Sequence, residues 1–281
     1  MKEFLQTIFR GIGQVMLQNN AWSGILFSIG ILINAPILSL AAFMGAVFST
    51  LTAKWLRYSS EDIENGLYGF NGALVGILTW FFFDVTLITG LFLIPGAAFS
   101  TWIQFQMKKF IPPYTAPFVI VGWILLLVIP VVSNLEILKS DVIFDDTTHF
   151  YYASAKGFGQ VMFQENEITG IFFLIGILVN SRISALYALY ASLISILIAI
   201  LLSIPDASIN AGLMGYNGIL CAIALSDIKH RRILWISLAI IISVLVNVGM
   251  AAIGFIPLTA PFVLTTWIFL KAIDKTDAKE V

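Results

Sequence analysis

Uncharged polar side chains recur in pairs along a chain that is otherwise largely apolar. Three of these pairs are Gln14 and Gln160, Asn71 and Asn217, and Thr115 and Thr259. Their amide and hydroxyl groups both donate and accept hydrogen bonds, but none is an acid or a base. Proton relays and ion-coupled carriers usually keep charged side chains at membrane depth. The set therefore favours recognition of a neutral polar solute over catalysis or ion transport.

The pairs arise because the chain repeats its own sequence. "GQVMLQNN" at 13–20 returns as "GQVMFQEN" at 159–166, and "GLYGFNG" returns as "GLMGYNG". Both are displaced by 146 residues (14 to 160, 71 to 217), and "TAPF" repeats with its proline displaced by 144 (117 to 261). We infer two homologous halves, 1–133 and 157–281, joined by a polar linker at 134–156. Self-similarity on this scale in a membrane protein is typical of a transporter or channel with its site between the repeats.

Composition places these halves in a bilayer. Of 281 residues, 59% are hydrophobic and 11% charged, with a mean hydropathy of +0.95, so polar surface is too scarce for a water-soluble globule. The start, "MKEFLQTIFRGIGQ", has no uninterrupted apolar segment or cleavage pattern, so we expect it to be retained. A net charge of −1 gives no basic face for nucleic acid. We predict an integral membrane protein surrounded by lipids.

Breaks in the apolar runs predict the number of crossings. "NAP" at 34–36 and "NSR" at 180–182 each divide a long run in two, which gives about five crossings per half. An odd number inverts the second half relative to the first. The first crossings, 22–33 and 168–179, are short, so each half needs a tilted or re-entrant helix in addition. The predicted fold class is an all-α polytopic membrane protein of two inverted halves with a pore between them.

Cationic residues orient this arrangement. A cytoplasmic N-terminus places the following on the cytoplasmic side, in agreement with the positive-inside rule: Lys54, Arg57, Lys108, Lys109, Arg182, Lys229, His230, Arg231, Arg232, Lys271, Lys275 and Lys279. The acidic linker then lies outside. We expect both termini in the cytoplasm and the protein in a bacterial inner membrane.

Other interpretations of single residues stay open at this stage. The amphipathic segment at 4–20 carries Gln14 and Gln18 away from its apolar side and could equally be an interfacial helix on the membrane surface. Structural interhelical hydrogen bonds are the favoured role for the asparagines. Cys221 is expected to be a packing residue, and neither histidine has partners at metal-ligand spacing, so no metal, cofactor or catalytic residue is predicted.

Large apolar residues accompany the polar pairs at matched positions, namely Leu17, Phe163, Phe70, Tyr216, Phe118 and Phe262. Singly, such residues most often pack in the interior or face lipid. In pairs beside polar groups they could form flat slots for a planar solute. The glycines and prolines of the repeated motifs interrupt helices and release backbone carbonyls to a cavity. Because carbonyls accept hydrogen bonds, the solute should be rich in N–H donors.

These motifs resemble the urea transporter family. "GIGQVMLQNNAWSG", "GLYGFNGALVG" and "YTAPF", with "GFGQVMFQENEITG", "GLMGYNGILCA" and "LTAPF", are similar to its signatures in order, and the chain is similar in length to compact bacterial members. The resemblance implies facilitated diffusion of urea and a homotrimer with one pore inside each protomer. Urea is planar and neutral, and its N–H groups need acceptors to replace lost water.

Residue by residue, the resemblance implies hydrogen-bonding roles for Gln14 and Gln160 near the two ends of a selectivity filter, and for Thr115 and Thr259 at its narrow middle. The implied slot residues are Leu17, Leu78, Phe70, Phe163 and Tyr216. Ala116 and Ala260 replace the larger residue that the family usually has before proline. Alternatives are a channel for short amides or ammonia, and less favourably a membrane protein without transport activity.

Overall fold

The computed structural model describes residues 2–138, 147–228 and 232–277, with the backbone alone for 274–277. Within these ranges the regular structure is entirely helical. In chain order the helices are α1 (Lys2–Gln14), α2 (Ala21–Asn34), α3 (Pro36–Trp55), α4 (Ser60–Glu64), α5 (Gly69–Phe82), α6 (Leu87–Met107), α7 (Ala116–Ser133), α8 (Phe150–Gly159), the 3-10 helix η1 (Gln160–Met162), α9 (Glu167–Asn180), α10 (Arg182–Leu201), α11 (Asp206–Asn210), α12 (Tyr216–Ala224), α13 (Arg232–Ala252) and α14 (Ala260–Asp277).

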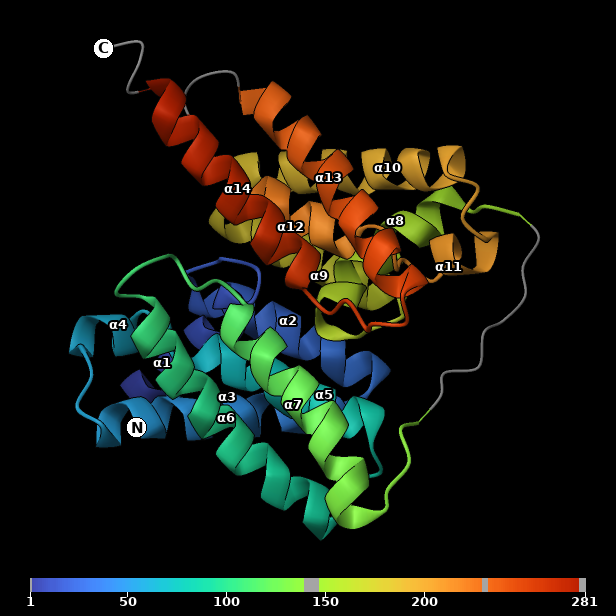
Figure 1. Ribbon diagram of the computed structural model, residues 1–281. Coiled ribbons are helices and arrows are strands. Elements are labelled where there is room, and N and C mark those ends of the chain that lie inside the picture. The colour runs from blue at the N-terminus through green and yellow to red at the C-terminus, as the bar shows by residue number, and fades with distance from the viewer. Residues whose placement is uncertain (1, 139–146, 229–231, 278–281) are drawn as a thin grey trace.

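The helices form two groups, with α1–α7 at the lower left and α8–α14 at the upper right of Figure 1. Helix lengths repeat in the same order. α2 and α9 each have 14 residues, α3 and α10 have 20, α6 and α13 have 21, and α7 and α14 have 18. The order of elements therefore follows the duplication in the sequence.

Five of these helices, α3, α6, α7, α10 and α13, are long and apolar enough to cross a membrane. The segment Phe150–Met162 joins α9 through a bend of 74°. Fourteen residues of α-helix span only about 21 Å, so α2 and α9 fall short of a hydrocarbon core of about 30 Å. The predicted all-α polytopic membrane protein is confirmed, and α2 and α9, at the predicted first crossings, are short apolar helices.

Both predicted breaks occur at helix boundaries. Pro36 begins α3, where its missing N–H costs no helical hydrogen bond. At the equivalent break, Ser181 precedes the first residue of α10 and caps the helix by accepting a hydrogen bond from the amide of Ser184, at 3.1 Å. The polar residues and the proline that interrupt the apolar runs were therefore enough to locate these two turns.

Helix α1 enters the bundle. Its residues from Ile8 onward include a buried stretch ending at Gln14, and a Cβ atom on Gly24 of α2 would overlap the carbonyl oxygen of Phe9. Gly170 of α9 lies equally close to the carbonyl of Ala155 in α8. Glycine permits this approach of two backbones. The interfacial-helix interpretation is therefore wrong for the second half of α1, which lies inside the protein.

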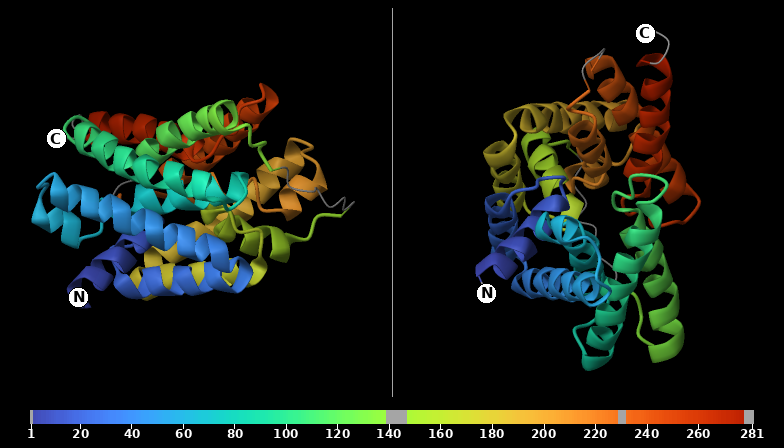
Figure 2. Two further views of the ribbon diagram at one scale, coloured as in Figure 1. Left: turned by 90° about the horizontal axis from the view of Figure 1, so that it is seen from below. Right: turned by 90° about the vertical axis from the view of Figure 1, so that its left-hand side faces the viewer.

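The start of α1 and the end of α14 lie at the same end of the molecule, at the left of the left-hand view in Figure 2. The end of α7 and the start of α8 lie toward the opposite end. Several predicted features, including the cluster 229–231, Lys279 and linker residues 139–146, lie outside the described residues.

Candidate functional site

Asparagines from neighbouring helices hold the starts of α7 and α14. The Asn71 side-chain oxygen accepts a hydrogen bond from the Phe118 amide at 3.0 Å, and Asn217 accepts one from the Phe262 amide at 3.1 Å. These first-turn amides have no partner within their own helix. Capping by a second helix therefore fixes where each helix begins, which confirms the structural role favoured for the two asparagines.

The same asparagines also fix the loops that precede these helices. Asn71 donates to the carbonyl oxygen of Tyr114 at 3.1 Å, and Asn217 donates to that of Leu258 at 3.3 Å. Tyr114 and Leu258 have left-handed backbones, with φ of 45° and 49°. Bulky residues seldom adopt this conformation, so the surrounding hydrogen bonds must hold it.

Each of these loops leads directly to one of the repeated threonines. The hydroxyl oxygens of Thr115 and Thr259 lie 2.7 Å apart and form a hydrogen bond. Only 1% of Thr115 and 3% of Thr259 is exposed. Across the same contact, Trp123 donates to the carbonyl of Ile256 at 2.9 Å and Trp267 donates to that of Pro112 at 2.8 Å. The two helix groups therefore meet at the threonine pair.

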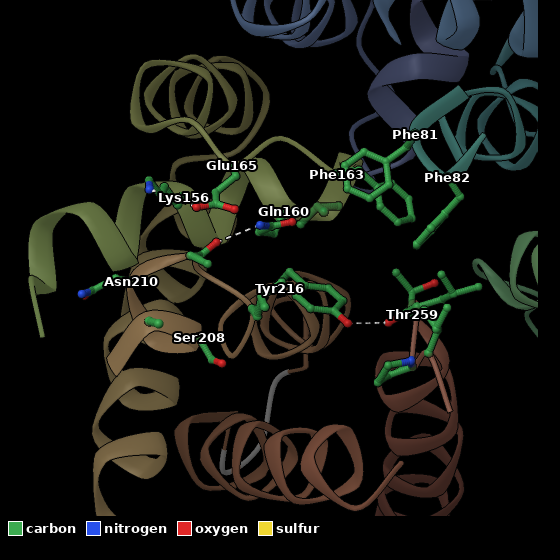
Figure 3. Close-up of a pocket in the computed structure, with 17 residues that line it drawn as sticks. Phe81, Phe82, Lys156, Gln160, Phe163, Glu165, Ser208, Asn210, Tyr216 and Thr259 are labelled. Carbon is green, nitrogen blue, oxygen red and sulfur yellow. Dashed lines mark hydrogen bonds and ion pairs between the residues drawn. The ribbon is translucent and has the colours of Figure 1, made fainter. Parts of the chain in front are cut away.

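A cavity of about 350 Å³, named the second cavity, reaches Thr259 of this pair from the second group of helices (Figure 3). Phe81, Phe82 and Phe163 gather on one side of it, and Tyr216 donates a hydrogen bond to the carbonyl of Leu258 at 2.8 Å. The sequence-predicted residues that line it are Gln160, Phe163, Tyr216 and Thr259.

Another cavity, of about 530 Å³, belongs to the first group of helices and is named the first cavity. The sequence-predicted residues that line it are Gln14, Leu17 and Phe70. Its outer part includes the loop between α6 and α7, which lies at the left of Figure 1, whereas α11 beside the other cavity lies at the right. The two cavities therefore approach the molecule's centre from opposite ends.

The two repeated glutamines have matching hydrogen bonds inside these cavities. Gln14 donates its amide nitrogen to the carbonyl of Asn65 at 3.0 Å, and Gln160 donates to that of Ala211 at 2.8 Å. Among the described residues, neither Oε1 atom has a hydrogen-bond partner. Each anchored amide thus presents an unoccupied acceptor at a cavity wall.

Gln18 and Gln164, which also repeat, differ in this respect. Gln18 donates to the carbonyl of Met16 and accepts a hydrogen bond from Asn180 at 2.9 Å. Gln164 donates to the carbonyl of Met162 and accepts one from Asn34, also at 2.9 Å. Both side-chain oxygens are therefore occupied. These glutamines join one group of helices to the other, are buried, and line neither cavity.

The remaining predicted site residues fall into two sets. Leu17 and Phe163 both have left-handed backbones, with φ of 59°, directly after the repeated glutamine turn. Phe118 and Phe262 are fully buried and contact Phe163 and Tyr114 with ring centroids 6.2 and 5.3 Å apart. Phe118, Phe262, Leu78 and Thr115 do not line either cavity.

Sequence reasoning did not identify several residues of the second cavity. Phe81 and Phe82 come from the end of α5, and Phe81 lies 5.0 Å from the ring of Phe163. They have no counterpart in the repeat, where Asp227 and Ile228 occupy the equivalent positions, so symmetry gave no signal. Lys156 and Glu165 form an ion pair of 3.3 Å at the same cavity. Equal positions in the two halves therefore do not guarantee equal cavity walls.

A duplicated set of membrane helices with two mainly apolar cavities, each lined by one of the repeated glutamines, is typical of the class of membrane transport proteins. Residues 5–273 match the family described as "Urea transporter". Proteins named urea transporter 1 from Ovis aries and Capra hircus are each 31% identical over 297 aligned residues, covering 95% of this chain and 77% of theirs. The Rattus norvegicus protein of that name is 32% identical, covering 79% of this chain and 63% of its own length. The chain belongs to the urea transporter family.

Proposed function

We propose that this family member, a passive transporter of urea, conducts it through a pore of its own within each protomer. The path runs from the first cavity past Thr115 and Thr259 into the second cavity. One observation carries the proposal: two cavities with matched glutamines reach Thr259 and Tyr114, and Thr115, which follows Tyr114, is hydrogen-bonded to Thr259. Family membership provides urea as the solute.

The chemistry of the walls suits urea. The free oxygens of Gln14 and Gln160 accept N–H hydrogen bonds that the solute would otherwise lose with its water. Phe163, Tyr216 and Leu17 offer apolar surface to its flat faces. When urea arrives, the threonine hydroxyls exchange their mutual bond for bonds to the solute. Such weak, successive contacts permit entry and exit alike.

The proposal includes an inverted repeat, with halves at 1–133 and 157–281 and a periplasmic linker at 134–156. Reciprocal hydrogen bonds between the groups support it. Ser23 donates to the carbonyl of Gly176 at 2.7 Å, and the equivalent Thr169 donates to that of Gly30 at 2.8 Å. The common end shared by the start of α1 and the end of α14 is consistent with two cytoplasmic termini.

Assembly as a homotrimer in a bacterial inner membrane completes the proposal. Because each protomer holds both cavities, the three pores should act independently. Mixed trimers of active and blocked subunits should lose flux in proportion to the blocked fraction. Complete loss from one blocked subunit would contradict a pore within each protomer.

Uptake by proteoliposomes tests the function. We expect rapid, saturable urea flux that exceeds flux of thiourea, acetamide and ammonia, and that does not change when a proton or sodium gradient is collapsed. Flux should not depend on these gradients because none of the repeated polar pairs is charged. Preference for acetamide or ammonia would favour the alternative of another small neutral solute.

A further inference from the structure

A third cavity, of about 830 Å³, lies away from the urea path, between the start of α1, the end of α3 and α4. Its lining is mostly polar and includes Arg10, Lys54, Arg57, Tyr58 and Glu64. Figure 1 shows α4 at the same end of the molecule as the N-terminus. No residue of either urea cavity lines it.

Cationic side chains outnumber carboxylates in this cavity by one. Three cations, Arg10, Lys54 and Arg57, face two carboxylates, Glu3 and Glu64. Arg10 donates to the main-chain oxygen of Glu64 at 3.0 Å, and the Lys54 ammonium lies 4.7 Å from the centre of the Phe4 ring. Across the described residues, neither Lys54 nor Arg57 is within ion-pair distance of a carboxylate. Two cations at the cavity are therefore available to an anion.

Hydrogen-bond donors other than these cations also reach the cavity. Tyr58 lines it and stacks on Phe105, with centroids 3.8 Å apart. Burial raises the pKa of Tyr58, so its hydroxyl stays protonated at neutral pH and can donate to an anionic oxygen.

The neighbouring residues place this cavity at the level of lipid headgroups. Trp55, between the two cations in sequence, is 80% exposed, and Leu51, one turn earlier in α3, is also exposed. Tryptophan concentrates at the membrane–water interface, and exposed leucine faces the acyl chains. The apolar face of α3 therefore ends where Lys54 and Arg57 begin, at the depth of phospholipid phosphates.

The second half has no such cluster. Ile200 and Ser203 stand where the first half has Lys54 and Arg57, 146 residues earlier. The backbones nevertheless agree, because Arg57 and Ser203 both have left-handed φ, of 56° and 55°. The fold of this turn thus does not require the cations. In the proposed topology they face the cytoplasmic leaflet, whose surface is negative.

We propose that this cavity binds the phosphate group of an anionic membrane phospholipid. Arg10, Lys54 and Arg57 surround the phosphate and Tyr58 donates to it, while the acyl chains follow the exposed face of α3 past Trp55 and Leu51. The site is separate from the urea pore, and it lets the first half, but not the second, bind an anionic phospholipid.

Native mass spectrometry of the detergent-purified full-length protein tests this assignment. The protein is offered equimolar phosphatidylglycerol and phosphatidylcholine, and the Lys54→Ile, Arg57→Ser variant carries the residues that the second half already uses. We expect preferential retention of phosphatidylglycerol by the wild type and about tenfold weaker retention by the variant. Urea flux of the variant should equal that of the wild type, which shows that it has folded.

The matched control, Arg232→Ser with Lys271→Ser, removes two cations outside the cavity and should retain phosphatidylglycerol. Equal retention of phosphatidylglycerol by the wild type and the cavity variant would overturn the proposal. A control variant that loses as much phosphatidylglycerol as the cavity variant would also overturn it, because the binding would then depend on general surface charge. Displacement of the lipid by millimolar inorganic phosphate would instead identify a site for free phosphate. If the double variant fails to fold, Lys54→Ile alone carries the same comparison.

Discussion

The two halves agree in their polar groups and differ in the surfaces around them. Gln14 and Gln160 make the same main-chain bond, and Thr115 and Thr259 bind each other. Their surroundings diverge, because the first cavity contains Leu17 and Phe70 where the second contains Phe163 and Tyr216. Along the proposed path, a solute passing in either direction would meet the same order of hydrogen-bonding groups but different apolar walls in the two cavities.

The outer surface shows a stronger divergence. The cationic cavity of the first half has no counterpart at Ile200 and Ser203, although the local backbone is the same. If the halves are inverted, the two equivalent turns face different leaflets and different solutions. The two halves thus match at the centre of the molecule and differ in this part of their outer surface.

The largest expected effect concerns the capping asparagines, whose equivalence can be tested. Asn71→Leu and Asn217→Leu each leave a buried first-turn amide without its partner and release a strained loop, so each should lower the free energy of unfolding by about 3 kcal/mol. Thermal unfolding in detergent measures this. Asn19→Leu, at an exposed position, is the control and should cost less than about 0.5 kcal/mol. A large loss of unfolding free energy in only one of the two variants would show that the two asparagines are not equivalent.

The threonine pair should show equal and non-additive effects. Thr115→Val and Thr259→Val each remove one hydroxyl from a single shared hydrogen bond, so each should reduce urea flux by roughly tenfold. Because residues in contact are coupled, the double variant should lose less than the product of the two reductions. Stopped-flow light scattering of proteoliposomes gives the rates. Strict additivity would indicate that urea meets the two hydroxyls separately.

A smaller effect is expected where the groups of helices join. Asn34→Leu and Gln164→Leu remove opposite partners of one side-chain hydrogen bond, and a double-mutant cycle on unfolding should give a coupling of about 0.6 kcal/mol, typical of membrane interiors. The equivalent cycle at Asn180 and Gln18 should give the same value. Unequal couplings would show that the two contacts are not equivalent.

The sequence predicted those features that depend on local pattern. The duplication, the breaks at 34–36 and 180–182, the short first crossings and the all-helical class all follow from composition, spacing and proline chemistry. The structural role of Asn71 was also predictable, since a buried amide in an apolar helix needs partners. These features need no knowledge of which distant side chains meet.

Features that depend on long-range contact could not be predicted. Gln14 and Gln18 repeat equally well, and only the fold shows that Asn180, 162 residues away, occupies the oxygen of Gln18. The burial of α1 was uncertain because an amphipathic pattern fits a membrane surface and a bundle interior equally. Phe81 and Phe82 enter the second cavity without a repeated signal. Side-chain direction at a left-handed residue such as Leu17 is likewise set by its surroundings.

Urea flux through glutamine variants tests the central claim most directly. Gln14→Leu and Gln160→Leu each remove a side-chain oxygen that would accept a hydrogen bond from desolvated urea. Each variant should therefore reduce urea flux, measured by stopped flow, by about tenfold or more. The double variant should reduce it further. Gln106→Leu, the same substitution at a residue that lines neither urea cavity, should keep flux within about twofold of the wild type. Wild-type flux in the folded Gln14→Leu, Gln160→Leu double variant would contradict the proposed path.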